Sequence, residues 1–192
     1  MRIGVFGGTF DPPHIGHLLL AADASESLSL DLLIFVPAGA QPLKVDTPPL
    51  ASGADRLEMV RLAVSGAPKY AVDDAEISRE GLSYTVDTLE HLAGRYKGAE
   101  LFFLLGQDAL ASFRQWRKPE RILELSTLAV MMRSAARDVG EWSKAERLIM
   151  LSTRRVDVSS TEIRERLRAK KTIRGFVPES VERFIEARGL YR

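Results

Sequence analysis

The sequence contains no cysteine. This absence excludes disulfide bonds, thiolate metal sites and a cysteine nucleophile, and it is compatible with a reducing compartment. The chain also lacks an excess of either charge, because 27 basic and 26 acidic side chains give a formal net charge of +1. Such a protein has no general electrostatic attraction for nucleic acid or for a membrane surface. Any anionic ligand must therefore be bound by local positive groups.

Long apolar runs are absent as well. No stretch approaches the roughly 20 apolar residues that a membrane-spanning helix needs. The first apolar run, residues 3–6, is interrupted at once by two glycines, so it is too short for a signal peptide. We therefore expect a cytoplasmic protein without nucleic-acid or membrane partners. The 192 residues match one ordinary domain and contain no repeat or linker, which predicts a single domain over residues 1–192.

Short apolar segments that end at glycine or proline alternate with segments of helical period. The apolar segments predict strands at 3–6, 32–36, 100–105 and 128–132, and shorter ones at 70–72, 76–78 and up to Val158. The amphipathic segments predict helices at 15–27, 55–64, 83–96, 109–113, 119–124, 161–169 and 178–188. This alternation favours an α/β fold, Rossmann-like and doubly wound, with a mainly parallel sheet and helices on both faces.

The first turn contains two of the three histidines of the chain. It reads Gly7-Gly8-Thr9-Phe10-Asp11-Pro12-Pro13-His14-Ile15-Gly16-His17. Glycines at a strand end let backbone N–H groups approach a phosphate closely. His14 and His17 are three residues apart at a helix start, so they share one face and the positive end of the helix dipole. Two imidazoles so placed can stabilise the charge that develops on phosphorus oxygens during nucleotidyl transfer. The third, His91, lies mid-helix and is expected to be a surface residue.

A second segment with anion-binding character lies near the end of the chain. It reads Ser159-Ser160-Thr161-Glu162-Ile163-Arg164 and predicts a helix N-terminus with a capping box from Ser159 to Glu162. Its hydroxyls and free backbone N–H groups collect at the positive end of a helix dipole. Capping alone would explain Ser159 and Glu162. Together with the first turn, however, the segment provides a site for the β- and γ-phosphates of a nucleoside triphosphate.

These motifs are similar to those of a known group of enzymes. The first turn resembles the His-x-Gly-His signature of the nucleotidyltransferase superfamily. Class I aminoacyl-tRNA synthetases share this signature, but they are much longer and carry a Lys-Met-Ser-Lys-Ser loop that is absent here. The whole set of motifs resembles the bacterial nicotinate-nucleotide adenylyltransferases. Besides the first turn, the set comprises residues 80–89, Gly106-Gln107-Asp108, Trp116, the Ser-Ser-Thr-x-Ile-Arg segment and Gly189-Leu190-Tyr191.

The resemblance implies transfer of AMP from ATP to nicotinate mononucleotide, which gives deamido-NAD and pyrophosphate, with Mg²⁺ carried on the triphosphate. It implies catalytic roles for His14, His17 and Lys44. The residues implied in ATP binding are Gly7, Gly8, Gly106, Asp108, Arg133, Ser159, Ser160, Thr161 and Arg164. Those implied in binding the mononucleotide are Thr9 at its phosphate, Phe10, Tyr84, Thr85 at its carboxylate and Trp116 against its ring. No cluster of metal ligands is visible, so no metal held by the protein alone is expected.

Two positions depart from the family pattern, and two other functions stay open. Leu43 stands where many relatives have histidine, and Ser134-Ala135 stand where Pro-Gly is common. Another superfamily member, acting on nicotinamide mononucleotide or phosphopantetheine or transferring CMP, is one alternative. A nucleotide-sensing module without catalysis is the other. No Ser–His or Cys–His nucleophile pair is evident, so transfer is expected to be direct and in line. The sequence does not indicate an oligomeric state.

Overall fold

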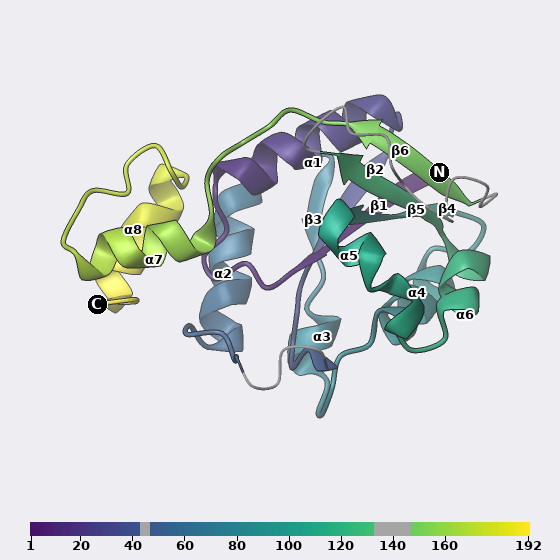
Figure 1. Ribbon diagram of the computed structural model, residues 1–192, viewed down its shortest axis with the longest axis horizontal. Helices are drawn as coiled ribbons and strands as arrows, with labels where there is room; N and C mark the ends of the chain where they lie inside the picture. Colours follow the sequence, from purple (N-terminus) through teal and green to yellow (C-terminus); the bar gives the residue numbers. More distant parts are fainter. Residues whose placement is uncertain (43–46, 133–146) are drawn as a thin grey trace.

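A computed structural model of the protein describes residues 1–42, 47–132 and 147–192 (Figure 1). Lys44 and Arg133, to which the sequence analysis gave roles, lie outside these residues, as do Leu43 and Ser134-Ala135. Within the described ranges, no helix combines the length and hydropathy that a membrane span requires.

The fold is built on one six-stranded sheet in the order β3-β2-β1-β4-β5-β6, and every pair of neighbours is parallel. The strands are β1 (Arg2–Gly8), β2 (Leu32–Pro37), β3 (Tyr70–Val72), β4 (Glu100–Gly106), β5 (Thr127–Met132) and β6 (Leu148–Ser152). The strand order reverses between β1 and β4, which is the switch point of a doubly wound sheet. The predicted Rossmann-like α/β fold is confirmed.

Helices cover both faces of this sheet. They are α1 (Ile15–Ser27), α2 (Gly53–Val64), α3 (Ala75–Ser78), α4 (Thr85–Arg95), α5 (Gln107–Ala111), α6 (Pro119–Leu125), α7 (Ser160–Arg168) and α8 (Glu179–Arg188), with a 3₁₀ turn at Phe113–Gln115. Alternate strand residues pack on opposite faces: Val5 joins the core under α4, α5 and α6, whereas Phe6 joins the core under α1 and α2. Burial on both faces explains why the central strands read as continuous apolar runs.

The last two helices form a third, smaller core. Ile163 of α7 and Val181 and Ile185 of α8 are buried together with Met59 of α2. In Figure 1 the chain leaves β6, passes over α1 and reaches α7 and α8, which lie beside α2. This path carries the serine-rich segment from the far edge of the sheet back to the first turn.

Two strand predictions are wrong. Residues 76–78 belong to the helix α3, because the Asp73 side chain accepts a hydrogen bond from Ala75 N at 3.0 Å and turns the chain out of the sheet. The strand predicted to end at Val158 instead spans Leu148–Ser152. It ends there because the backbone N–H of Arg154 is bonded to the Asp23 side chain of α1 at 2.9 Å and not to a neighbouring strand.

Candidate active site

A cavity of about 560 Å³ opens at the carboxyl ends of β1 and β4. In parallel sheets, ligands bind at this edge, beside the switch point. From the strand ends it is lined by Gly7, Gly8, Thr9, Gly106 and Asp108. From α4 and the segment before α6 it is lined by Tyr84, Thr85 and Trp116. Eight of the predicted site residues, far apart in the sequence, therefore surround one cavity.

Phe10 is the exception among the residues predicted to contact the mononucleotide. Its side chain is only 2% exposed and packs against Phe6, Phe35 and the ring of His17. A Cβ atom at Gly8 would lie 2.9 Å from the Phe10 ring, so the glycine allows this ring to fill the space beneath the turn. Phe10 has a φ of 49°, a left-handed conformation that turns its side chain inward. Contrary to the prediction from the sequence, the Phe10 side chain therefore does not line the cavity; instead it supports the turn from within the core.

The histidine loop, residues 9–17, continues from Phe10 into α1. His14 is the residue before the helix and is 8% exposed. Its backbone N–H donates to Nδ1 of His17 at 3.2 Å, and the two rings stack with centroids 3.7 Å apart. Because Nδ1 of His17 accepts this hydrogen bond, the neutral ring carries its proton on Nε2. His17 is thus held as a donor by a contact within the loop itself.

Gly16 allows the two imidazoles to lie this close together. A Cβ atom at this position would be 3.0 Å from the His14 ring and 3.4 Å from Val156, which precedes the serine-rich segment. Any larger residue would push the His14 ring or the Val156 segment away. Gly16 therefore keeps the loop and the segment before α7 in contact.

A buried polar network anchors the histidine loop from below. Asp11, 4% exposed, accepts hydrogen bonds from the backbone of Leu50 and Ala51 and, at 2.7 Å, from the hydroxyl of Tyr191. Burial, followed by the hydrogen bond to Asp11, raises the pKa of Tyr191. A neighbouring arginine, Arg56, donates to the carbonyl of Thr9 at 2.7 Å, and burial lowers its pKa.

Sequence reasoning found no role for Asp11, Arg56 or Tyr191. Tyr191 was part of the quoted terminal motif, but nothing local connects it to a residue 180 positions earlier. Buried, hydrogen-bonded side chains such as these hold the histidine loop in one geometry.

The serine cap, residues 159–164, lies directly against the histidine loop. Ser160 Oγ donates to the carbonyl of Pro12 at 2.8 Å, and Arg164 Nη1 donates to the carbonyl of Asp11 at 2.7 Å. Ser159 Oγ accepts from the backbone N of Glu162 at 3.1 Å, which confirms Ser159 as the helix cap and thus the first half of the predicted capping box. Arg164 also donates to Thr161 Oγ1 at 3.1 Å. Ser160 and Arg164 therefore join the two predicted phosphate-binding segments to each other.

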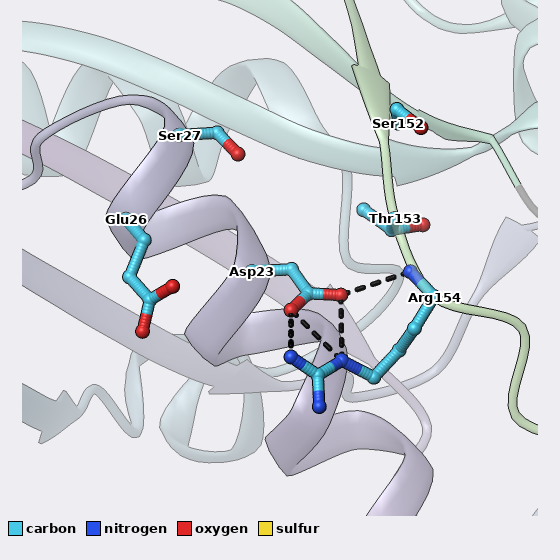
Figure 2. Close-up of a pocket in the computed structure, with 6 residues that line it drawn as sticks. All are labelled: Asp23, Glu26, Ser27, Ser152, Thr153 and Arg154. Atoms are coloured by element: carbon cyan, nitrogen blue, oxygen red, sulfur yellow. Dashed lines mark hydrogen bonds and ion pairs between the residues drawn. The ribbon is translucent and has the colours of Figure 1, made fainter.

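An ion pair holds the approach to the serine cap in place. Figure 2 shows that Arg154 donates hydrogen bonds to the Asp23 carboxylate of α1. The donors are Nε at 2.9 Å, Nη2 at 2.6 Å and the backbone N. The hydrogen bond from Arg154 lowers the pKa of Asp23. An open hollow of about 450 Å³ surrounds this pair. No residue predicted to bind a substrate lines this hollow, and the guanidinium of Arg154 is hydrogen-bonded to Asp23. We therefore assign the ion pair a structural role.

One acidic residue of the cavity was missed from the sequence. Glu76 of α3 lines the cavity and accepts a hydrogen bond from Thr88 Oγ1 of α4 at 2.7 Å. Burial raises its pKa, while the hydrogen bonds from Thr88 and from the Gly39 backbone oppose that shift. Glu76 stands in a segment that the strand prediction misassigned, so the sequence offered no signal for this placement.

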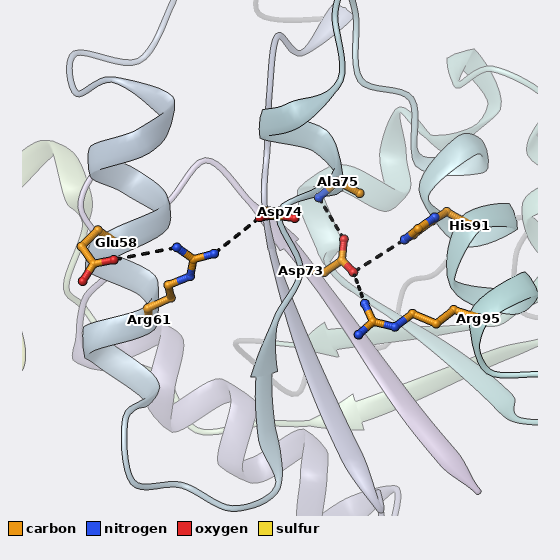
Figure 3. A network of polar contacts seen from close by, with 7 residues as sticks. All are labelled: Glu58, Arg61, Asp73, Asp74, Ala75, His91 and Arg95. Atoms are coloured by element: carbon orange, nitrogen blue, oxygen red, sulfur yellow. Dashed lines mark hydrogen bonds and ion pairs between the residues drawn. The ribbon is translucent and has the colours of Figure 1, made fainter.

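A polar network at the end of β3 connects α3 and α4 to the sheet. Figure 3 shows the buried carboxylate of Asp73 at the end of β3. Its Oδ2 lies 3.1 Å from Arg95 Nη1 and 3.8 Å from His91 Nε2. Arg61 of α2 pairs with Asp74 at 3.4 Å in the same region. The predicted surface position of His91 is confirmed, because about half of its side chain is exposed.

No group of three or more metal-ligating side chains gathers within residues 1–42, 47–132 and 147–192. The donors at the cavity and the histidine loop include glycine N–H groups, hydroxyls, imidazoles and the guanidinium of Arg117. Such donors bind phosphate oxygens directly.

The cytidylyltransferase-like family model matches residues 5–166 of the chain. Together with the parallel sheet and the paired histidines, this match places the protein in the class of cytidylyltransferase-like nucleotidyltransferases. The chain is 46% identical over its whole length to a probable nicotinate-nucleotide adenylyltransferase of Gemmatimonas aurantiaca, 93% of which is covered. It is 44% identical to the protein of the same name from Thermus thermophilus, over all of both chains. The protein belongs to the family of nicotinate-nucleotide adenylyltransferases, and the resemblance seen in the sequence is confirmed.

Solved structures show the same fold at lower identity. The nicotinic acid mononucleotide adenylyltransferase of Plasmodium falciparum, determined in complex with NaAD, matches with a TM-score of 0.81. The match covers 99% of this chain and 97% of that one at 18% identity. The arrangement of the sheet and helices is therefore shared well beyond the bacterial relatives.

Proposed function

We propose that the protein transfers AMP from ATP to nicotinate mononucleotide, forming deamido-NAD and pyrophosphate. One observation of this structure supports the proposal most directly. The histidine loop and the serine cap are joined by the hydrogen bonds of Ser160 and Arg164, at 2.8 and 2.7 Å, beside the cavity at the ends of β1 and β4. The two segments that we propose to bind phosphate thus meet beside one cavity.

We place the mononucleotide in this cavity. In the proposed complex the pyridine ring lies against Trp116. The indole of Trp116 donates to Ser112 Oγ at 3.4 Å, meets Phe103 edge-on and packs at a tilt against Phe113. The ring carboxylate points to the N-terminus of α4, where the backbone N–H of Thr85 is available to it. The phosphate lies at the other end of the cavity, against Gly8 and Thr9.

ATP lies across the histidine loop. In this arrangement the α-phosphate is next to His14 and His17, and the β- and γ-phosphates reach the N-terminus of α7. Asp108, at the start of α5, holds ribose hydroxyls. Lys44 and Arg133 are proposed as further phosphate contacts. Mg²⁺ enters as part of the MgATP substrate and keeps most of its own water ligands.

The reaction is a single displacement. A phosphate oxygen of the mononucleotide forms a bond to the α-phosphorus of ATP, and the bond from that phosphorus to the bridging oxygen of the β-phosphate breaks. Pyrophosphate leaves with the electron pair. The imidazole donors act on the charge of the transition state, and no enzyme nucleophile takes part. The configuration at the α-phosphorus should therefore be inverted, which a chiral α-thio-ATP would reveal.

The decisive experiment measures pyrophosphate release and dinucleotide formation with ATP and nicotinate mononucleotide. We expect His17→Ala to lower kcat by about 10²–10³, the effect of removing one positioned donor, with little change in KM. His91→Ala is the matched control, because His91 is half-exposed, does not line the cavity, and its removal leaves Asp73 with its hydrogen bonds from Ala75 and Arg95. Binding of ATP without turnover would favour the sensing module instead. Turnover of phosphopantetheine but not of a pyridine nucleotide would contradict the proposed substrate.

A further inference from the structure

The charges around the cavity are unevenly distributed. Three charged side chains line it among the described residues, and two of them, Glu76 and Asp108, are acidic. Arg117 is the only cationic side chain in that part of the lining. The proposed substrate is an anion at both ends, with a phosphate at one and a ring carboxylate at the other. Glycine N–H groups serve the phosphate end, so the ring end depends on α4 and Arg117.

Arg117 lies at the N-terminus of α4, where it contacts two residues: Tyr84, which caps the helix, and Asp87 in its first turn. Its guanidinium carbon lies 4.5 Å from the centroid of the Tyr84 ring, and Nη1 lies 3.7 Å from Asp87 Oδ2. The guanidinium and the partial positive charge of the helix therefore act at the same place.

We propose that Arg117 is a specificity-determining residue that selects a pyridine ring with a carboxylate over one with a carboxamide. This inference rests on the proposed function, and it identifies Arg117 as the side chain that distinguishes nicotinate mononucleotide from nicotinamide mononucleotide. Nicotinate and nicotinamide mononucleotides differ by one negative charge on the ring substituent. Trp116 stacks on either ring equally well, so stacking cannot separate them. A nearby positive charge can.

The expected size of the effect is moderate. The Arg117 side chain is 49% exposed and shares its charge with Asp87, so solvent screens it. Two unit charges about 6 Å apart, at an effective dielectric constant near 40, correspond to about a tenfold change in an equilibrium constant.

The test compares kcat/KM for the two mononucleotides in the wild-type protein and in Arg117→Gln. We expect kcat/KM for nicotinate mononucleotide to fall about tenfold, mainly through KM. The value for nicotinamide mononucleotide should change less than about twofold, so the preference collapses. Arg117→Lys keeps the positive charge but loses the planar group over Tyr84, so it should keep part of the preference. Added salt should reduce the preference of the wild type and have little effect on that of Arg117→Gln.

Two further variants separate charge from scaffolding. Arg121→Gln is the matched control, because Arg121 also pairs with α4, through Glu90 at 3.2 Å, but does not line the cavity. It should leave the preference unchanged. Asp87→Asn removes the carboxylate that partly neutralises Arg117 and should increase the preference for nicotinate. Circular dichroism establishes that each variant is folded.

An equal loss for both substrates in Arg117→Gln would overturn the inference, since it would mean that Arg117 only supports Tyr84. A decrease of the preference in Asp87→Asn would overturn it as well. Failure of the proposed function has a different signature. In that case the wild-type protein itself releases no pyrophosphate with either mononucleotide, and the role of Arg117 falls with it.

Discussion

Replacing Tyr191 with phenylalanine should weaken the support beneath the histidine loop. The Tyr191 hydroxyl donates to Asp11 Oδ1 at 2.7 Å, inside the core that packs α7 and α8 against α2. The substitution keeps the ring and leaves Asp11 with the backbone donors of Leu50 and Ala51. The cost is therefore that of one hydrogen bond to a charged group, about 1.5–3 kcal/mol in the free energy of unfolding. For a chain of this length, this lowers Tm by about 3–12 °C.

The loss of unfolding free energy in Tyr191→Phe should depend on pH, because the Tyr191 hydroxyl titrates at different pH values in the folded and unfolded states. Burial and the bond to Asp11 raise its pKa above the ordinary value of 10.0, so the folded protein keeps a proton that the unfolded chain loses near pH 10. Below pH 10 the stabilisation is fully present. Above pH 10 the unfolded state binds fewer protons than the folded state, and the contribution falls by about 1.4 kcal/mol per pH unit.

Urea unfolding of the wild type and Tyr191→Phe between pH 7 and 11 measures this difference. We expect a constant gap in the free energy of unfolding up to about pH 9 and a narrowing gap above pH 10. Tyr70, whose pKa burial also raises, is present in both proteins and cancels in the comparison. A gap that stays constant or widens up to pH 11 would refute the assignment of this hydrogen bond.

Two further substitutions test the loop and the cap. Gly16→Ala places a Cβ atom 3.0 Å from the His14 ring, so the ring must move and kcat should fall at least about tenfold; a kcat within about twofold of the wild type would contradict the close fit. Ser159→Ala removes the cap of α7 and should cost about 1 kcal/mol, a Tm decrease of about 2–4 °C by differential scanning fluorimetry. It should also raise KM for ATP and not for the mononucleotide; an unchanged Tm would show that the cap contributes nothing.

The local chemistry of the chain was readable from its sequence. The period of the apolar residues predicted the α/β fold and most element positions, because the spacing of buried side chains along a helix or a strand is set within that element. The same holds for the glycine turn after β1 and for the cap at Ser159, whose hydrogen bond spans three residues. The failures at 76–78 and 148–158 occurred where a side-chain hydrogen bond interrupts the strand pattern: Asp73 accepts from Ala75 N at the start of α3, and Asp23 of α1 accepts from Arg154 N after β6.

The candidate site was predictable only in part, and the residues that were missed share a cause. Glu76 and Arg117 line the cavity because α3 and the segment after Trp116 fold over the same strand ends. Neither belongs to a local motif that carries chemistry by itself. Phe10 was assigned to the substrate only through the family resemblance of the first turn, yet its left-handed backbone conformation turns the ring into the core.

The sequence by itself determined the alternation of strands and helices, the two phosphate-binding motifs and the family, since all of these are written in short runs of neighbouring residues. Only the tertiary structure decided that the histidine loop and the serine cap meet. Ser160 reaches Pro12 across 148 positions, and Tyr191 reaches Asp11 across 180. Contacts of such separation depend on how α7 and α8 pack against α2, and no local pattern encodes where a buried apolar face will dock.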